Sequence, residues 1–147
     1  MKTASWVILA VGTVLVLLGS LASVGVAYFA APTVDQTVPG TSVQKLGTDA
    51  GNPELTTALR ARRGTAAAYA VAYGVLLLFI VLVPYRRGDV WAWWAVLAGA
   101  LTVFLLYALR VPTLGTKQGV GIPAALQLGV MAVGLLLDAS RLGAKKA

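Results

Sequence analysis

Few residues in this sequence could take part in chemistry, and most of those stand at the ends of long apolar runs. The chain has no histidine and no cysteine, and its 5 Asp+Glu are outnumbered by 12 Lys+Arg. Imidazole acid–base catalysis, thiolate nucleophiles, disulfides and Cys/His metal sites are therefore excluded. No glycine-rich phosphate-binding loop is present either. The sequence predicts a protein that is not an enzyme and that holds no metal or cofactor.

Two tyrosines and a glutamine are among the most polar side chains deep in the apolar runs, along with Thr13, Ser20, Ser23 and Thr102. Tyr69 and Tyr73 are four residues apart and so share a helix face, and Gln127 lies in the last apolar run. Together they could bind a quinone, a sterol-like ligand or a transported polar substrate. They could also hydrogen-bond a neighbouring helix, a contact worth about 1 kcal/mol. We favour the second interpretation.

Charged residues avoid the interior of every apolar run. Asp138 comes closest, and Arg141 lies three residues further along on the same helix face, which predicts a surface ion pair. Charges inside a membrane mark transport pathways because each costs a few kcal/mol to hold there. A proton-coupled exporter usually carries a carboxylate inside the membrane, and this sequence places none there.

The most distinctive local pattern is PYRRGDVWAWW, residues 84–94. Arg86 and Arg87 could reach lipid phosphates, while Trp91, Trp93 and Trp94 could lie at headgroup depth. We interpret this segment as an anchor at the membrane interface. A specific site for an anionic lipid or a partner is the alternative.

Long apolar runs must position these residues. Of the whole chain, 59% is hydrophobic and only 12% is charged, against roughly 25% in a soluble domain. The predicted spans cover residues 6–31, 65–83, 90–109 and 120–137. In lipid the backbone must satisfy its own hydrogen bonds, so each span should be a helix. The predicted fold is an all-α, antiparallel four-helix transmembrane bundle forming one domain over residues 1–147.

The first run could also be a cleaved signal peptide, but it exceeds the roughly 7–15 apolar residues of such a segment. Residues 32–63 form the only sizeable polar region, in which prolines and glycines predict a structured loop of turns and extended segments. Near its end, Asn52, Pro53 and Glu54 predict a helix start. That helix should lead into Arg60, Arg62 and Arg63 at the bilayer surface.

Small residues are frequent in the predicted spans. Small side chains let membrane helices approach closely, so they predict packing faces within the bundle or against another subunit. The candidates are Gly19, Ser23, Ala70, Gly74 and Gly129.

The charge distribution gives a weak orientation signal. With four spans, six Lys and Arg fall on each side of the membrane. Lys2 precedes the first span, and the short turn with Arg86 and Arg87 is the kind of loop that best obeys the positive-inside rule. We therefore predict cytoplasmic termini, in the inner membrane of a bacterium, since the Ala, Leu, Val and Gly bias fits a GC-rich bacterial genome. Balanced charge also permits dual topology. Because the basic residues flank apolar runs, we expect lipid rather than nucleic acid as their partner.

Residues 84–94, with the upstream segment NPEL, resemble small four-helix bacterial membrane proteins, including DoxX-like and related domains of unknown function. In these a basic turn is followed by a tryptophan-rich helix start. The similarity covers about the second and third spans, and it implies a four-helix membrane fold but little about mechanism.

The leading hypothesis for function is a non-catalytic accessory or structural subunit that packs in a larger membrane complex or with itself. The first alternative is a small oligomeric transporter or channel that uses Tyr69, Tyr73 and Gln127 as a polar path. The second is a lipid- or quinone-binding module near the tryptophans.

Overall fold

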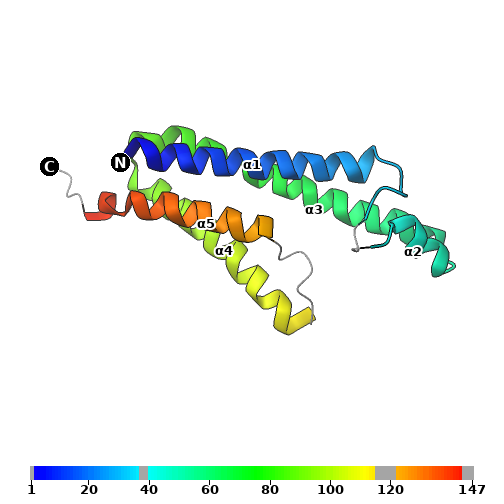
Figure 1. Ribbon diagram of the computed structural model, residues 1–147. Helices are drawn as coiled ribbons and strands as arrows, with labels where there is room; N and C mark the ends of the chain where they lie inside the picture. The colour runs from blue at the N-terminus through cyan, green and yellow to red at the C-terminus, as the bar shows by residue number, and fades with distance from the viewer. Residues whose placement is uncertain (1, 37–39, 115–121, 144–147) are drawn as a thin grey trace. The chain divides into compact units, whose positions relative to one another are not determined.

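The computed structural model describes residues 2–36, 40–114 and 122–143, and within them the chain is helical, with no strand. Five α-helices follow one another along the chain (Figure 1): α1 (Lys2–Tyr28), α2 (Val43–Asp49), α3 (Pro53–Ile80), α4 (Val90–Leu114) and α5 (Ile122–Leu137). A π-helical turn, Val81–Tyr85, extends α3, and a 3-10 turn, Ala139–Gly143, follows α5. The all-helical prediction is confirmed.

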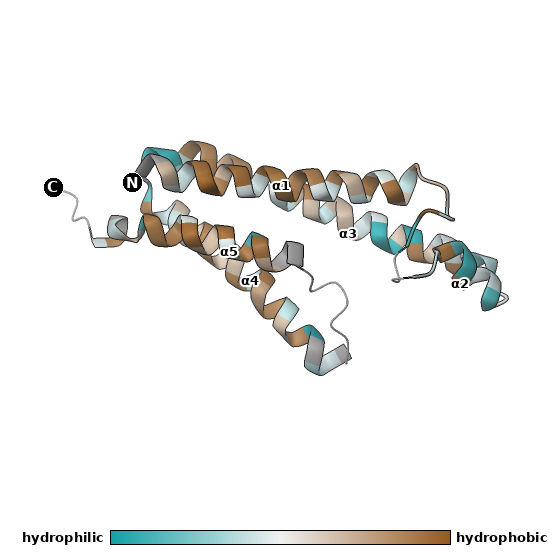
Figure 2. Ribbon diagram, in the orientation of Figure 1, coloured by the Kyte–Doolittle hydropathy of each residue, from teal (hydrophilic) through white to brown (hydrophobic). Residues whose placement is uncertain are grey.

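Three helices are long and apolar enough to cross a membrane. Their candidate spans are Ala4–Tyr28, Pro53–Tyr85 and Val90–Arg110. The fourth predicted span forms the shorter α5, whose 16 residues cover about 24 Å against a hydrocarbon core of roughly 30 Å. In Figure 2, hydrophobic residues dominate α1, α4 and α5, whereas α2 and the start of α3 are hydrophilic.

The predicted helix start at Asn52 is confirmed. The Asn52 side chain accepts a hydrogen bond from the backbone N–H of Glu54 at 3.0 Å, and Pro53 occupies the first helical position. From there α3 continues without a break to Ile80. The expected surface helix and the expected second span are therefore one element.

The polar loop contains a helix that the sequence analysis did not predict. Turns and extended segments were expected, but residues 43–49 form α2. Ser42 caps it by accepting a hydrogen bond from Lys45 N–H at 3.2 Å, and the Thr56 hydroxyl of α3 donates to the Val43 carbonyl at 3.2 Å. A serine cap and a contact with the next helix thus outweigh the local excess of turn-forming residues.

The chain divides into two compact units, where the sequence analysis had expected one domain. The first comprises Met1–Val14 and Leu76–Ala147, and the second comprises Leu15–Val75.

In the first unit, two glycines let the start of α1 pack closely on α5. A Cβ at Gly134 would lie 2.7 Å from the Leu9 side chain, and one at Gly12 would lie 2.8 Å from Val130. Figure 1 shows α4 beside α5 on its other side. Large apolar side chains fill this core: Leu9, Leu77, Val81, Val96, Met131 and Leu135.

In the second unit, the rest of α1 packs on α3. A Cβ at Gly74 would lie 2.7 Å from Leu17, and one at Gly64 would lie 2.6 Å from the Tyr28 ring. Ala67 and Ala27 are also buried here. Because the buried side chains are small, the two helices can approach closely.

Candidate functional site

The basic turn between α3 and α4 is closed by its own backbone. Pro84 lies within the π-helical turn, where Arg86 N–H bonds the Val81 carbonyl. Asp89 N–H then bonds the Pro84 carbonyl at 3.0 Å, and Gly88 N–H bonds the Tyr85 carbonyl at 3.1 Å. This is a Schellman cap, and Gly88 has the positive φ, 98°, that the cap needs. The Pro84 and Tyr85 carbonyls are thus paired without a side chain.

The two arginines of this turn are both exposed. The Arg86 guanidinium lies 5.1 Å from the centre of the Trp6 ring, a cation–π contact. Arg87 is exposed. Neither arginine forms a hydrogen bond or an ion pair within the part of the chain that the structure describes. Their predicted place at an exposed end of the apolar helices is compatible with lipid contact.

The three tryptophans that follow divide into two kinds. Trp91 and Trp94 are exposed, as a lipid anchor requires. Trp93, predicted as an anchor with them, is only 8% exposed, and its indole N–H donates to the Leu135 carbonyl of α5 at 3.0 Å. It shares the α4 face of buried Val96, three residues on, so it packs inside the protein. Trp93 is therefore a core residue and not a surface anchor.

A buried polar cluster holds the end of α5, and the sequence analysis missed it. The Ser5 hydroxyl donates to the Gly134 carbonyl at 2.7 Å and lies 2.8 Å from the Tyr85 hydroxyl. Asp138, just beyond α5, is also buried. The side chain of its predicted partner, Arg141, lies outside the described residues. Ser5 and Tyr85 are 80 residues apart, so no local pattern could have paired them.

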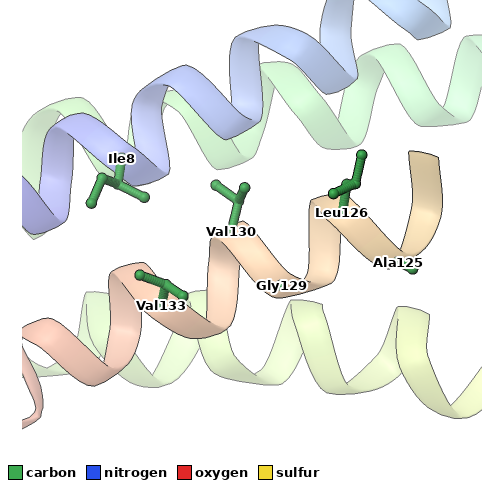
Figure 3. Close-up of a pocket in the computed structure, with 6 residues that line it drawn as sticks. All are labelled: Ile8, Ala125, Leu126, Gly129, Val130 and Val133. Carbon is green, nitrogen blue, oxygen red and sulfur yellow. The ribbon is translucent and has the colours of Figure 1, made fainter. Parts of the chain in front are cut away.

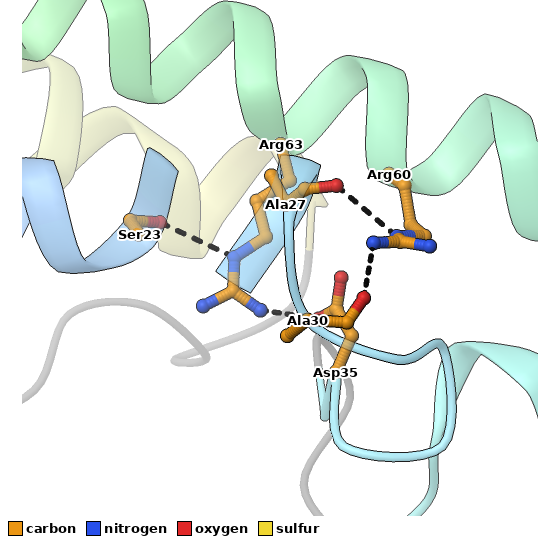
Figure 4. A network of polar contacts seen from close by, with 6 residues as sticks. All are labelled: Ser23, Ala27, Ala30, Asp35, Arg60 and Arg63. Carbon is orange, nitrogen blue, oxygen red and sulfur yellow. Dashed lines mark hydrogen bonds and ion pairs between the residues drawn. The ribbon is translucent and has the colours of Figure 1, made fainter. Parts of the chain in front are cut away.

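A second pair of arginines, in the second unit, is engaged by protein groups (Figure 4). Arg60 donates to the carbonyls of Ala27, at 3.1 Å, and Ala30, at 2.6 Å. The last carbonyls of a helix lack partners within it, so Arg60 supplies donors at the end of α1.

Arg63, one turn after Arg60 on α3, forms an ion pair with the fully buried Asp35. It also donates to the Ser23 hydroxyl at 3.2 Å. The arginine side chain keeps 27% of its surface exposed. The sequence analysis placed Arg63 at the bilayer surface but did not single out Asp35. The two residues are 28 positions apart in the sequence, which hides the pair from any local pattern.

The residues of the predicted polar path belong to different units. Tyr69 and Tyr73 lie in the second unit and Gln127 in the first. Tyr69 is 75% exposed. The Tyr73 hydroxyl is buried and has no hydrogen-bond partner among the described residues. The structure therefore describes no site that the three share.

The predicted packing residues also differ from one another. Gly74 packs against Leu17, Ser23 accepts from Arg63, and Ala70 is half-buried. A Cβ at Gly19 or Gly129, by contrast, would meet no atom of another described segment within 4 Å. These two glycines make no close approach within their units.

Gly129 lies in an open groove of the first unit, with a volume of about 470 Å³ (Figure 3). Aliphatic side chains and glycine alone line it, so it offers no group for catalysis or for binding a polar ligand. The lining residues are Ile8, Ala125, Leu126, Gly129, Val130 and Val133.

Comparison with known proteins gives no relative. No protein family, curated protein or solved structure matches this chain significantly. Its function is therefore inferred from its own residues.

Proposed function

We propose that this chain is a non-catalytic integral membrane protein that associates laterally with other membrane helices. It acts as an accessory subunit of a larger complex or as a homo-oligomer. In this proposal α1, α3 and α4 cross the bilayer, and α5 is a shorter fourth membrane helix. The observation that carries it is an exposed face of α3 made of small residues.

We call this surface the α3 small face. Its members are spaced as neighbours on one side of a helix, and all are exposed: Ala61, Thr65, Ala68, Tyr69 and Ala72. The Thr65 hydroxyl donates to the Ala61 carbonyl at 3.0 Å, so its polar group is already satisfied within the helix. Apart from Tyr69, the surface that remains is shallow and largely free of bulky side chains.

Other exposed surfaces of the long helices carry more large apolar residues, and this includes α3 itself from Val75 on. On α1 and α4 they carry large apolar residues: Leu15, Leu18, Leu21, Phe104, Leu105 and Leu106. Such surfaces suit lipid tails. In a bilayer, helices associate through close van der Waals packing rather than through the hydrophobic effect, and small residues permit it. The contrast supports a partner helix on the α3 small face.

Tyr69 gives a second reason to expect a partner there. Its side chain is the only bulky member of the α3 small face and is 75% exposed. A hydroxyl placed in hydrocarbon without a hydrogen bond is costly, whereas a neighbouring helix can supply an acceptor. A partner on this face would cover the alanines and satisfy the tyrosine together.

For orientation we propose cytoplasmic termini in a bacterial inner membrane. The support is the short turn with Arg86 and Arg87, which are both exposed. Short loops rich in Lys and Arg tend to lie on the cytoplasmic side of a membrane. In this orientation residues 32–52, including α2, lie outside the cytoplasm.

Because the chain has no cysteine, single cysteines can test the proposal cleanly. Ala68→Cys and Ala72→Cys would each carry a thiol-linked photo-crosslinker, and the protein would be irradiated in its native membrane. Leu105→Cys and Leu106→Cys, on the large-residue surface of α4, are matched controls. We expect a protein adduct of one defined mass from positions 68 and 72, and lipid adducts from positions 105 and 106. Lipid adducts alone from all four positions would refute lateral association through this face.

A Tyr69→Phe variant sharpens the same test. If the hydroxyl bonds a partner helix, its loss should weaken the adduct at position 68 while leaving the fold of the chain unchanged. An adduct of undiminished yield would mean that Tyr69 does not contact the partner.

A further inference from the structure

We propose that the turn between α3 and α4 binds the phosphate of an anionic phospholipid. The site, here called the arginine–tryptophan turn, comprises Trp6, Arg86, Arg87, Trp91 and Trp94 of the first unit. It is independent of the α3 small face, which belongs to the second unit. The proposal goes beyond anchoring, because it states a preference for negatively charged headgroups.

The Arg86 guanidinium is held in place before any lipid arrives. Its contact with the Trp6 ring, at 5.1 Å, restricts a long side chain that would otherwise sample many rotamers. The π-helical turn and the Gly88 cap also fix the backbone around it. Ordering an exposed arginine normally costs side-chain entropy, so this pre-positioning favours binding.

The N–H donors of both arginines remain available for a phosphate. Guanidinium groups bind phosphate oxygens with two parallel hydrogen bonds. In the second unit the same groups on Arg60 and Arg63 are used by carbonyls, a hydroxyl and a carboxylate. Asp89 is the carboxylate nearest in sequence, and it forms no ion pair with either arginine in the described part of the chain. An anion from outside the chain can therefore occupy the donors.

The surroundings select a phospholipid over a soluble phosphate. Trp91 and Trp94 are exposed and three residues apart on α4, so they form one indole surface beside the turn. Indoles settle at headgroup depth, where the phosphates also lie. Exposed apolar residues, Phe79, Leu82 and Val83, precede the turn on the α3 side. A ligand here must offer a phosphate at the edge of a hydrocarbon layer.

The chain supplies its own probe for this site. The chain has 4 tryptophans, and all of them report on this turn. Trp6, Trp91 and Trp94 belong to the site, and Trp93 lies between the last two. Intrinsic fluorescence therefore reports on lipids near this turn. The purified protein would be reconstituted in phosphatidylcholine vesicles with increasing amounts of either brominated phosphatidylglycerol or brominated phosphatidylcholine. Quenching by each lipid gives the relative association constant at the turn.

We expect the anionic lipid to bind about five-fold more strongly than the zwitterionic one, as one arginine at a membrane surface typically provides. Raising the salt concentration should reduce this preference. Arg87→Gln should reduce it, because one of the two guanidinium groups is lost, and should leave the fold undisturbed, because Arg87 has no hydrogen bond or ion pair within the described protein. Arg62→Gln, the same charge change at an exposed position of the second unit, should leave it unchanged.

Two results would overturn the proposal. The first is equal quenching of the native protein by both lipids. The second is a preference that survives in the Arg86→Gln/Arg87→Gln variant while its tryptophan emission maximum equals that of the native protein. The Arg87→Lys variant, which keeps the charge but loses the bidentate geometry, should retain a reduced preference.

Discussion

Two pairs of arginines in this protein have opposite environments. Arg60 and Arg63, on α3, donate to the end of α1 and to Asp35, so their guanidinium groups are part of the fold. Arg86 and Arg87, at the other end of the same helical segment, have no hydrogen bonds or ion pairs within the described residues. Both pairs flank apolar helices, and sequence alone places both at a bilayer surface.

The difference follows from how each neighbouring helix ends. The end of α1 leaves the Ala27 carbonyl for Arg60, and the loop beyond it carries a carboxylate for Arg63. At the end of the α3 segment the Gly88 cap pairs the Pro84 and Tyr85 carbonyls with backbone N–H groups, so these two carbonyls need no arginine. In this chain the arginines beside one helix end are therefore used by the fold, whereas the donors of those beside the other end stay free within the described residues.

The largest effect is expected at Arg63. Arg63→Gln removes the cation beside buried Asp35 and should lower the free energy of unfolding by about 3 kcal/mol, the lower end for such pairs because Arg63 is partly exposed. Reversible unfolding in mixed micelles, followed by circular dichroism, measures it. Adding Asp35→Asn should recover part of the loss. A cost no larger than that of Arg62→Gln would remove the distinction between the two arginine pairs.

The second largest loss of stability is expected at Arg60. Arg60→Gln loses two hydrogen bonds from a charged donor to the carbonyls of Ala27 and Ala30, which should cost about 1–2 kcal/mol in the same assay. Arg60→Lys keeps the charge but cannot reach both carbonyls with one planar group, so its cost should be intermediate. Equal stability of the native protein, Arg60→Gln and Arg60→Lys would show that the end of α1 does not need Arg60.

A smaller effect is expected at Arg86. Arg86→Gln removes only the contact with the Trp6 ring and should cost about 0.5–1 kcal/mol. A double-mutant cycle with Trp6→Leu isolates that contact. Strictly additive costs would mean that the ring does not hold the guanidinium, and the pre-positioning argument for the lipid site would fail with it.

The smallest effect on stability is expected at Arg87. Arg87→Gln should change the unfolding free energy by no more than about 0.5 kcal/mol, as for other exposed positions. The same variant should lose part of the preference for anionic lipid, because Arg86 remains. A variant that is destabilised as much as Arg60→Gln would place Arg87 among the structural arginines and contradict the comparison.

Local signals in the sequence were enough for several elements. Asn52, Pro53 and Glu54 predicted the start of α3 because a helix start depends on residues within one turn. The apolar runs predicted helices long enough to cross a membrane, since length and composition decide that property. By contrast, α2 was missed because its cap at Ser42 and its contact with Thr56 lie in a segment rich in turn-forming residues.

The candidate sites were less predictable than the helices. Trp91, Trp93 and Trp94 look alike in sequence, but only the position of α5 buries Trp93. Gly19 and Gly74 are both small residues of long helices, but only Gly74 meets a neighbouring side chain. Whether a helix position faces lipid or protein depends on which other helix lies beside it.

The sequence by itself determined that this chain lacks histidine and cysteine chemistry and that it consists of long apolar helices with basic ends. These properties depend on composition and on spacing over a few residues. Only the tertiary structure decided which arginines serve the fold, because Asp35 and Arg63 meet across 28 residues and Ser5 and Tyr85 across 80. Contacts over such distances arise from helix packing, which brings together residues with no local relation.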